Sequence, residues 1–277
     1  MTQLTFIDVG STTIQMEFPE ENTEVLPGVT WGDVNGFPTP AYWAYRVIER
    51  RLEKKPIQYK QGRSLLEEVG ACILGGHGIP ASMGKAAYEH LKSKDVFSGK
   101  PHKETQLYKW LSEPIDHLGK PAKYRFSKQK AKYLYSALEE LNTNTPPLST
   151  GKELRNWLLR IKGIGPKTAS WIARNWLEAD DVAILDIHIY RAGLLARFFS
   201  PELTVEKNYF ELEESFLSLA SALGVSASEL DAVMWYEMQN SNSVHRLLKS
   251  LQNKETSQST SHKPNERQPK PQQIALI

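Results

Sequence analysis

Apolar and polar residues alternate along the first twenty positions of the chain, on either side of Gly10. Alternation with a period of two is typical of β-strands, and a glycine between two such runs favours a tight turn. The sequence therefore predicts a β-hairpin over residues 1–20. The stretch that follows, PGVTWGDVNGFPTP, is rich in glycine and proline and predicts a loop.

From Pro40 onward, apolar residues recur at the three- and four-residue spacing of amphipathic helices. The helical segments show no repeat period and are, in order, PAYWAYRVIERRLE, SLLEEVGACILGG, SMGKAAYEHLK, SKQKAKYLYSALEEL, KELRNWLLRI, PKTASWIARNW, DIHIYRAGLLARFF, EKNYFELEESFLSLASAL, SASELDAVMWYEMQ and VHRLLKSL. We predict a mainly α fold with a small N-terminal β element. Its parts are residues 1–60 (hairpin, loop and first helix), a helical domain over 61–251, and a polar, disordered tail over 252–277.

The composition narrows the classes of protein to consider. With 40% hydrophobic and 24% charged residues, the chain is typical of a globular protein. The single cysteine, Cys72, excludes an intramolecular disulfide and a cysteine-ligated zinc or iron–sulfur site. No apolar run reaches membrane-spanning length, and the N-terminus shows no export signal. We therefore expect a cytoplasmic monomer with no cofactor, no metal and no membrane partner.

Positive charge is concentrated in two stretches, although the formal net charge is only +2. Residues 123–132, KYRFSKQKAK, hold five basic residues and no acid, and residues 152–174 hold six basic residues and one glutamate. Such stretches predict a local positive surface that binds phosphate. A solvated helix face is the alternative interpretation.

The stretch RIKGIGPKTASWIARNW, residues 160–176, contains two glycines before a predicted helix. Gly163 and Gly165 permit positive φ angles and a close backbone approach to a ligand. Pro166 suits the first helical position, where its missing N–H costs nothing. The backbone N–H groups at this helix N-terminus predict an anion site, although short Gly-x-Gly turns are common.

Lys167 lies in or near the first turn of that helix, where the positive end of the macrodipole disfavours a cation. A partly buried amine there loses its proton more easily and becomes a nucleophile for a sugar or carbonyl carbon. The alternative is a lysine whose stem packs while its amine reaches solvent. Asp186 follows an apolar run 19 residues later. It is either the N-cap of the next helix or a carboxylate aimed at the same pocket.

The hairpin LRIKGIGPKTASWIA followed by AILDIHIYRAG resembles the helix-hairpin-helix, Gly/Pro-rich-loop, catalytic-Asp superfamily of DNA glycosylases, nearest the 8-oxoguanine glycosylases. The resemblance is specific over residues 152–200, weaker over about 61–240, and absent from 1–55. It implies a helix-hairpin-helix fold, with the hairpin at 152–176. It also implies base excision from duplex DNA, with Lys167 attacking the sugar C1′ to give a Schiff base that allows strand cleavage. Asp186 would stabilise the positive charge that develops on the sugar.

The resemblance also implies a pocket for the flipped base. Trp171 falls where the family has a cysteine facing the base, Trp235 where it has a stacking phenylalanine, and Asp231 where it has a glutamine at the pairing edge. A carboxylate accepts from the N1–H and amine of a guanine-like edge, and also from a cytosine amine. These exchanges leave 8-oxoguanine, another modified purine or guanine itself as the target. Core packing is the alternative for both tryptophans.

Five further residues fall where the family contacts DNA. His188 matches a position near the backbone phosphate of the flipped nucleotide, and a core or capping role is equally consistent with it. His77, between glycines, lies where the family faces the orphaned partner base, and a loop histidine without a role is the alternative. For Lys128 and Lys130 we expect phosphate contacts, and for Gln129 insertion as a wedge.

Three functions compete at this stage. The first is a bifunctional DNA glycosylase with AP lyase activity. The second is a helix-hairpin-helix DNA-binding protein without catalysis, although phosphate binding by the hairpin needs neither Lys167 nor Asp186. The third is a specialised glycosylase that defends against foreign DNA with altered bases.

Overall fold

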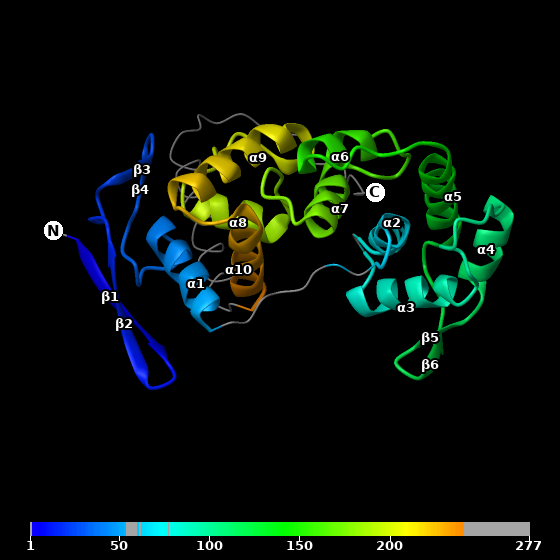
Figure 1. Ribbon diagram of the computed structural model, residues 1–277, viewed down its shortest axis with the longest axis horizontal. Coiled ribbons are helices and arrows are strands. Elements are labelled where there is room, and N and C mark those ends of the chain that lie inside the picture. Colours follow the sequence, from blue (N-terminus) through cyan, green and yellow to red (C-terminus); the bar gives the residue numbers. More distant parts are fainter. Residues whose placement is uncertain (1, 54–59, 61, 77, 241–277) are drawn as a thin grey trace, which may run out of the picture. The chain divides into compact units, whose positions relative to one another are not determined.

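The computed structural model describes residues 2–53, 60, 62–76 and 78–240 (Figure 1). Across these residues the chain forms ten helices and three two-stranded antiparallel sheets. The mainly α class is thus confirmed. Within the described part of the chain, contacts group residues 2–236 into one compact unit. The expected helix VHRLLKSL and the expected tail over 252–277 lie outside the described residues.

The N-terminal hairpin has the predicted place and turn. Strand β1 (Gln3–Val9) pairs with β2 (Thr12–Phe18), and Gly10 has a φ of 61° in the turn between them. A second hairpin follows, β3 (Glu24–Leu26) and β4 (Val29–Thr30), so the prediction of a loop over residues 27–40 was wrong for β4, and β3 was not predicted. The strands are too short to show an alternating pattern against their glycine-rich surroundings.

Helix α1 (Pro40–Leu52) begins at Pro40, as the sequence predicts. The Thr39 hydroxyl accepts from the Tyr42 amide at 3.1 Å, and Pro40 occupies the first turn. The remaining helices are α2 (Leu65–Leu74), α3 (Ala81–Lys92), α4 (Glu104–Ser112), α5 (Ser127–Thr143), α6 (Gly151–Leu158), α7 (Pro166–Leu177), α8 (Ile187–Leu195), α9 (Val205–Ala222) and α10 (Ala227–Asn240).

One helix and one hairpin between α3 and α5 were not predicted. Helix α4 buries only Leu107 and Leu111, so its apolar period is weak in the sequence. It is followed by the hairpin of β5 (Ile115–His117) and β6 (Lys120–Ala122). Leu118 and Gly119 both have positive φ angles in its turn, so no glycine pair marks it in the sequence.

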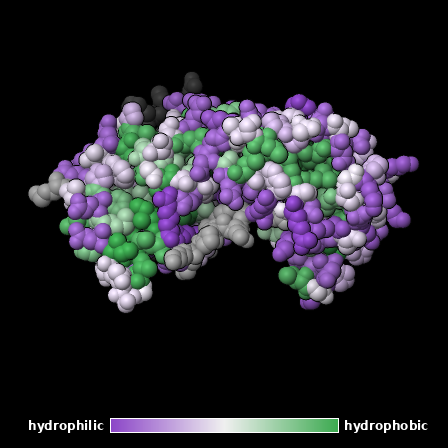
Figure 2. Space-filling model, viewed as in Figure 1, coloured by the Kyte–Doolittle hydropathy of each residue, from purple (hydrophilic) through white to green (hydrophobic). Residues whose placement is uncertain are grey.

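One hydrophobic cluster joins α2, α4, α5, α6 and α7. Each of these helices contributes a side chain with no exposed surface: Leu74, Leu107, Leu134, Leu158 and Ile172. Polar side chains cover much of the face seen in Figure 2, with apolar patches between them. The hairpin of α6 and α7 is therefore fixed by its inner faces (Figure 1), which leaves its connecting loop at the surface.

Candidate active site

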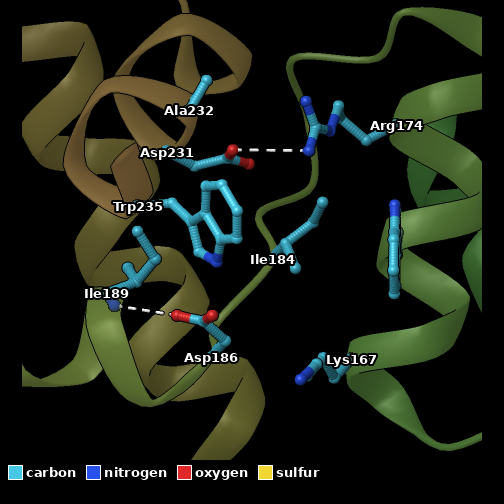
Figure 3. A pocket seen from close by; sticks show the side chains of 9 residues that line it. Lys167, Arg174, Ile184, Asp186, Ile189, Asp231, Ala232 and Trp235 are labelled. Atoms are coloured by element: carbon cyan, nitrogen blue, oxygen red, sulfur yellow. Dashed lines mark hydrogen bonds and ion pairs between the residues drawn. The ribbon is translucent and has the colours of Figure 1, made fainter. Parts of the chain in front are cut away.

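A cavity of about 220 Å³ lies between the faces of α7 and α10 and the segment that leads into α8 (Figure 3). It is lined by Lys167, Trp171, Arg174, Ile184, Asp186, Ile189, Asp231, Ala232 and Trp235. All five residues that the sequence assigned to catalysis or to the base pocket are in this set. They come from three segments up to 68 residues apart along the chain. Sequence spacing connects these residues only as i,i+4 pairs within one helix, whereas the fold places all of them on one cavity.

Helix α7 supplies one wall of the cavity. Lys167, Trp171 and Arg174 occupy positions i, i+4 and i+7, which share one helix face. Trp171 is half-buried and packs against the hydrophobic cluster. Arg174 was not predicted to line a pocket, although its i+7 spacing from Lys167 places it on the same face. The basic stretch predicted it at the surface instead.

Helix α10 supplies the facing wall through the predicted pair at i and i+4. Asp231 is 3% exposed, whereas Trp235 is 40% exposed. The ring of His188 meets Trp235 edge-on, with ring centroids 6.5 Å apart. His188 therefore contacts a wall of the cavity without being among its lining residues. Ile184, Ile189 and Ala232 complete the apolar surface.

Asp186 is both the helix N-cap and a lining residue. Its Oδ1 accepts from the backbone amides of His188 at 2.8 Å and Ile189 at 3.0 Å, which caps α8. The two alternatives drawn from the sequence are therefore compatible in this fold. Figure 3 shows Asp186 and Lys167 at the same end of the cavity. Capping fixes the carboxylate in place while it borders the cavity.

The hairpin loop departs from two expectations. Lys167 is exposed, so the prediction of a partly buried amine was wrong; it occupies the second position of α7, at the surface end of the cavity. Gly163 has the expected positive φ of 91°, but Gly165 has a φ of −93° and needs no glycine for its backbone angles. A Cβ on Gly163 would lie 2.2 Å from the ring of Tyr133, so the close approach there is to α5. Gly165 has open space around it.

The inner end of the cavity holds a buried ion pair. Nη2 of Arg174 lies 3.4 Å from Oδ1 of Asp231, and both side chains are at most 7% exposed. The pKa of Asp231 is raised to about 7, mainly by burial and also by the negative charges of Asp186 and Asp180. Arg174 and the backbone of Ile184 act in the opposite direction. At this separation the attraction of the guanidinium does not offset the loss of hydration.

Replacing Asp231 by asparagine is expected to change how stability depends on pH. The folded pKa of about 7 exceeds the reference value of 3.8, so the folded state retains a proton that the unfolded state releases between these values. The free energy of unfolding of the native sequence should therefore fall from pH 4 to pH 7, by up to about 4 kcal/mol. Urea unfolding across that range should show the fall, and Asp231→Asn should remove it.

Asp116→Asn is the matched control, because Asp116 is exposed on β5. Its unfolding profile should follow that of the native sequence. Identical pH slopes for the native chain and Asp231→Asn would show that Asp231 ionises freely in the folded state.

A buried network holds the segment that carries Asp186. Glu213 of α9 accepts from Arg155 of α6 at 2.5 Å, from Ser170 of α7 at 3.1 Å and from the Ala183 amide at 3.0 Å. The Tyr209 hydroxyl donates to the Ala183 carbonyl at 2.7 Å and accepts from the Leu185 amide at 3.3 Å. Burial holds the pKa of this phenol well above its usual range, so it keeps its donor proton. Both arms of the helical hairpin are thus linked to the residues just before Asp186.

Tyr209→Phe is expected to slow the reaction more than it weakens DNA binding. The change removes both hydrogen bonds to residues 183–185 and lets Asp186 shift relative to Lys167. A displacement on the order of 1 Å can lower a rate by about 100-fold. Single-turnover rates and duplex dissociation constants measure the two effects.

Tyr190→Phe is the control, because its hydroxyl makes a similar bond, 2.7 Å to the Leu203 carbonyl. That bond does not involve the residues before Asp186. Equal rate losses in the two variants would mean that Tyr209 contributes only to general stability.

The residues predicted to contact DNA outside the cavity have varied surroundings. Lys128 and Gln129 are exposed at the start of α5, and the Gln129 amide donates to the Tyr133 hydroxyl at 3.0 Å. Lys130 is half-buried and donates to the Gly75 carbonyl at 2.9 Å, at the end of α2. Burial lowers the pKa of Lys130. His77 lies outside the described residues.

The second basic stretch is less exposed than expected. Arg155 pairs with Glu213 and Arg174 with Asp231, and both arginines are buried. Arg160 lies 2.5 Å from Glu140. The prediction of a positive surface over residues 152–174 was therefore wrong for the two buried arginines, because each lies inside the fold beside an acidic side chain.

Neither a metal centre nor a single membrane-spanning helix is found in the described part of the chain. Residues 2–53, 60, 62–76 and 78–240 contain no group of three or more His, Cys, Asp or Glu side chains that could hold a metal ion. No single helix among them is long and apolar enough to cross a bilayer. The bent pair of α9 and α10 passes by length and composition only, as the buried helices of a protein core also do.

The hairpin of α6 and α7, with Lys167 and the N-cap Asp186 on one cavity, defines a helix-hairpin-helix protein with a pocket beside its hairpin. Residues 48–225 match the sequence model of the 8-oxoguanine DNA glycosylase family with the Ogg-type helix-hairpin-helix domain. The chain belongs to this family. The match includes Lys167 and Asp186 and ends before α10, which carries Asp231 and Trp235.

Individual relatives are similar over parts of the chain. The 8-oxoguanine DNA glycosylase/AP lyase of Metallosphaera sedula is 39% identical over 135 residues, which cover 45% of this chain and 63% of that protein. The enzyme of the same name from Methanocaldococcus jannaschii is 29% identical over 203 residues, which cover 69% of this chain and 88% of that protein. A crystal structure of the 8-oxoguanine DNA glycosylase of M. jannaschii aligns with a TM-score of 0.47 and 27% identity, over 62% of this chain and 76% of that one.

Proposed function

We propose that the protein is a bifunctional DNA glycosylase and AP lyase that removes an 8-oxoguanine-like purine from duplex DNA. The observation that carries this proposal is the shared cavity of Lys167 and Asp186, bordered by two tryptophans and a buried carboxylate. Its family and the printed names of its relatives support the same activity. A protein that only bound phosphate with its hairpin would need neither Lys167 nor Asp186.

The target base must leave the helical stack, because its C1′ is inaccessible inside a duplex. Trp171 and Trp235 offer aromatic surfaces to the extruded base, and such stacking contributes about 1–3 kcal/mol per base. The edge of the base then faces Asp231, while the sugar lies near Lys167 and Asp186. This order runs from the exposed Lys167 to the buried Asp231, which lie at opposite ends of the cavity in Figure 3.

The reaction begins with the neutral amine of Lys167. Nζ forms a bond to C1′ as the C1′–N9 bond breaks, and the base leaves with the electron pair and takes up a proton. Asp186 carries the compensating negative charge beside the developing positive charge of the sugar. Opening of the sugar ring gives a Schiff base. Loss of a C2′ proton then expels the 3′ phosphate and cleaves the strand.

Borohydride trapping tests the proposal directly. The full chain is mixed with duplexes that carry 8-oxoguanine, an abasic site or no lesion, and the adduct is measured after reduction of the C=N bond. We expect a covalent protein–DNA product with the first two duplexes. Binding without an adduct on either one would support a DNA-binding protein without catalysis. A cytoplasmic location belongs to the same proposal, since a chain with one cysteine does not use an intramolecular disulfide.

A further inference from the structure

The inner end of the cavity presents a hydrogen-bond donor and an acceptor side by side. Arg174 and Asp231 line it together, from α7 and α10. We propose that this pair selects the base by its 6-oxo and N1–H groups, so that the enzyme accepts lesioned 6-oxopurines as a class and does not require the 2-amino group of guanine. This inference rests on the proposed function and adds Arg174 as a specificity-determining residue.

The position of the pair suits a reader of the base edge. In Figure 3, Arg174 and Asp231 lie at the end of the cavity away from Lys167 and Asp186, with Trp235 between the two ends. A nucleotide whose C1′ meets Lys167 extends its base inward along the tryptophan. The edge farthest from the sugar, which carries the pairing groups, then meets the ion pair.

Asp231 offers one unengaged acceptor atom. Its Oδ1 lies 3.4 Å from Arg174, whereas its Oδ2 is buried without a hydrogen-bond partner among the described residues. An unsatisfied buried carboxylate oxygen is costly, which points to a donor that arrives with the ligand. The N1–H of a 6-oxopurine is such a donor, and its O6 accepts from the guanidinium.

The 2-amino group has no comparable partner. The side chains beside the ion pair on the lining are the apolar Ile184 and Ala232, which offer no acceptor. Guanine and hypoxanthine both present O6 and N1–H, and they differ only at C2. Adenine presents an amine at C6 and a lone pair at N1. Its amine would then face the guanidinium of Arg174, donor against donor, and its N1 would face the carboxylate of Asp231, acceptor against acceptor.

Single-turnover excision by the full chain tests the selectivity. The three substrates are matched duplexes with 8-oxoguanine, 8-oxohypoxanthine or 8-oxoadenine opposite cytosine. We expect the first two rates to agree within about 3-fold and the third to be roughly 10- to 100-fold lower. A rate on 8-oxohypoxanthine as low as on 8-oxoadenine would overturn the proposal, because the 2-amino group would then be read. Equal rates on all three would overturn it as well.

Substitutions of Arg174 test whether its guanidinium is the donor that selects the 6-oxo group of the base. Arg174→Met is expected to bring the rates on 8-oxoguanine and 8-oxoadenine within a few-fold of each other, and Arg174→Lys, which keeps a donor, to restore part of the difference. Asp231→Asn provides a second test if Arg174→Met does not fold, because an amide can donate to the adenine N1. Its relative rate on 8-oxoadenine should rise. Unchanged selectivity in the folded variants would exclude the pair as the reader.

An abasic duplex separates this inference from the proposed function. It has no base to read, so its cleavage by each variant reports folding and lysine chemistry and normalises the excision rates. No adduct on any duplex would overturn the proposed function and this inference together. Excision of 8-oxoguanine with strict dependence on the 2-amino group would overturn the inference alone.

Discussion

Lys167→Gln is expected to abolish the borohydride adduct and to lower base excision by roughly 10⁴- to 10⁶-fold, the range found when a covalent nucleophile is removed. The glutamine amide keeps much of the length and polarity of the side chain but cannot form a Schiff base. Lys167 is exposed at the second position of α7, so the helix and the cavity should persist. Trapping and single-turnover excision on an 8-oxoguanine duplex measure the two losses.

Lys162→Gln is the matched control for this change. Lys162 is an exposed lysine of the same hairpin loop, five residues earlier, and it does not line the cavity. The control loses the same charge and should still form the adduct. If Lys167→Gln kept the adduct while Lys162→Gln lost it, the nucleophile would have been assigned to the wrong residue.

The hairpin and the positions of Lys167 and Asp186 on it and after it could be predicted from sequence because the signals are local. Glycine, proline and a following helix mark the loop, and an aspartate before an amphipathic run marks the next N-cap. The i,i+4 pairs on α7 and α10 correctly indicated shared helix faces. That both faces border one cavity required the resemblance, because no spacing in the sequence links residues 167–174 to 231–235.

Sequence patterns could not predict which charged side chains are buried. Arg155 and Arg174 look like surface cations in a basic stretch, yet each meets a carboxylate from a helix more than 50 positions away. Conversely, Lys167 was expected to be partly buried and is exposed. A charged residue is buried only when a partner from another part of the fold compensates it, and that partner is invisible to a local pattern.

The N-terminal region shows a related limit. Alternation predicted β1 and β2, yet Leu4 and Phe6 of β1 are 53% and 56% exposed. The pattern identified the strands without identifying which face packs. The family match begins only at residue 48, after these strands.

Asp186→Asn is expected to lower excision by roughly 100- to 1,000-fold while leaving the fold almost unchanged. Asparagine is about as good an N-cap as aspartate, so the bonds from the His188 and Ile189 amides persist. Only the negative charge is lost, and its interaction with the α8 dipole contributes about 0.3–1 kcal/mol. Thermal melting and single-turnover rates separate these effects.

Asp186→Ala completes the comparison, because alanine removes the cap and the charge together. It should lower the free energy of unfolding by about 1 kcal/mol and slow excision to the level of Asp186→Asn. Asp181→Asn is the control outside the cavity, because Asp181 accepts from the Lys152 amide at 2.9 Å near the start of α6. It should melt and react like the native chain.

The three variants distinguish the two roles of Asp186. A residue that served only as a cap would retain its activity as asparagine and lose it as alanine, in step with the melting temperature. A residue whose charge stabilises the sugar cation would lose its activity equally in both, whatever the change in stability. Because the cap bonds hold the carboxylate beside the cavity, we expect the second pattern, with capping serving to fix the charge that the reaction uses.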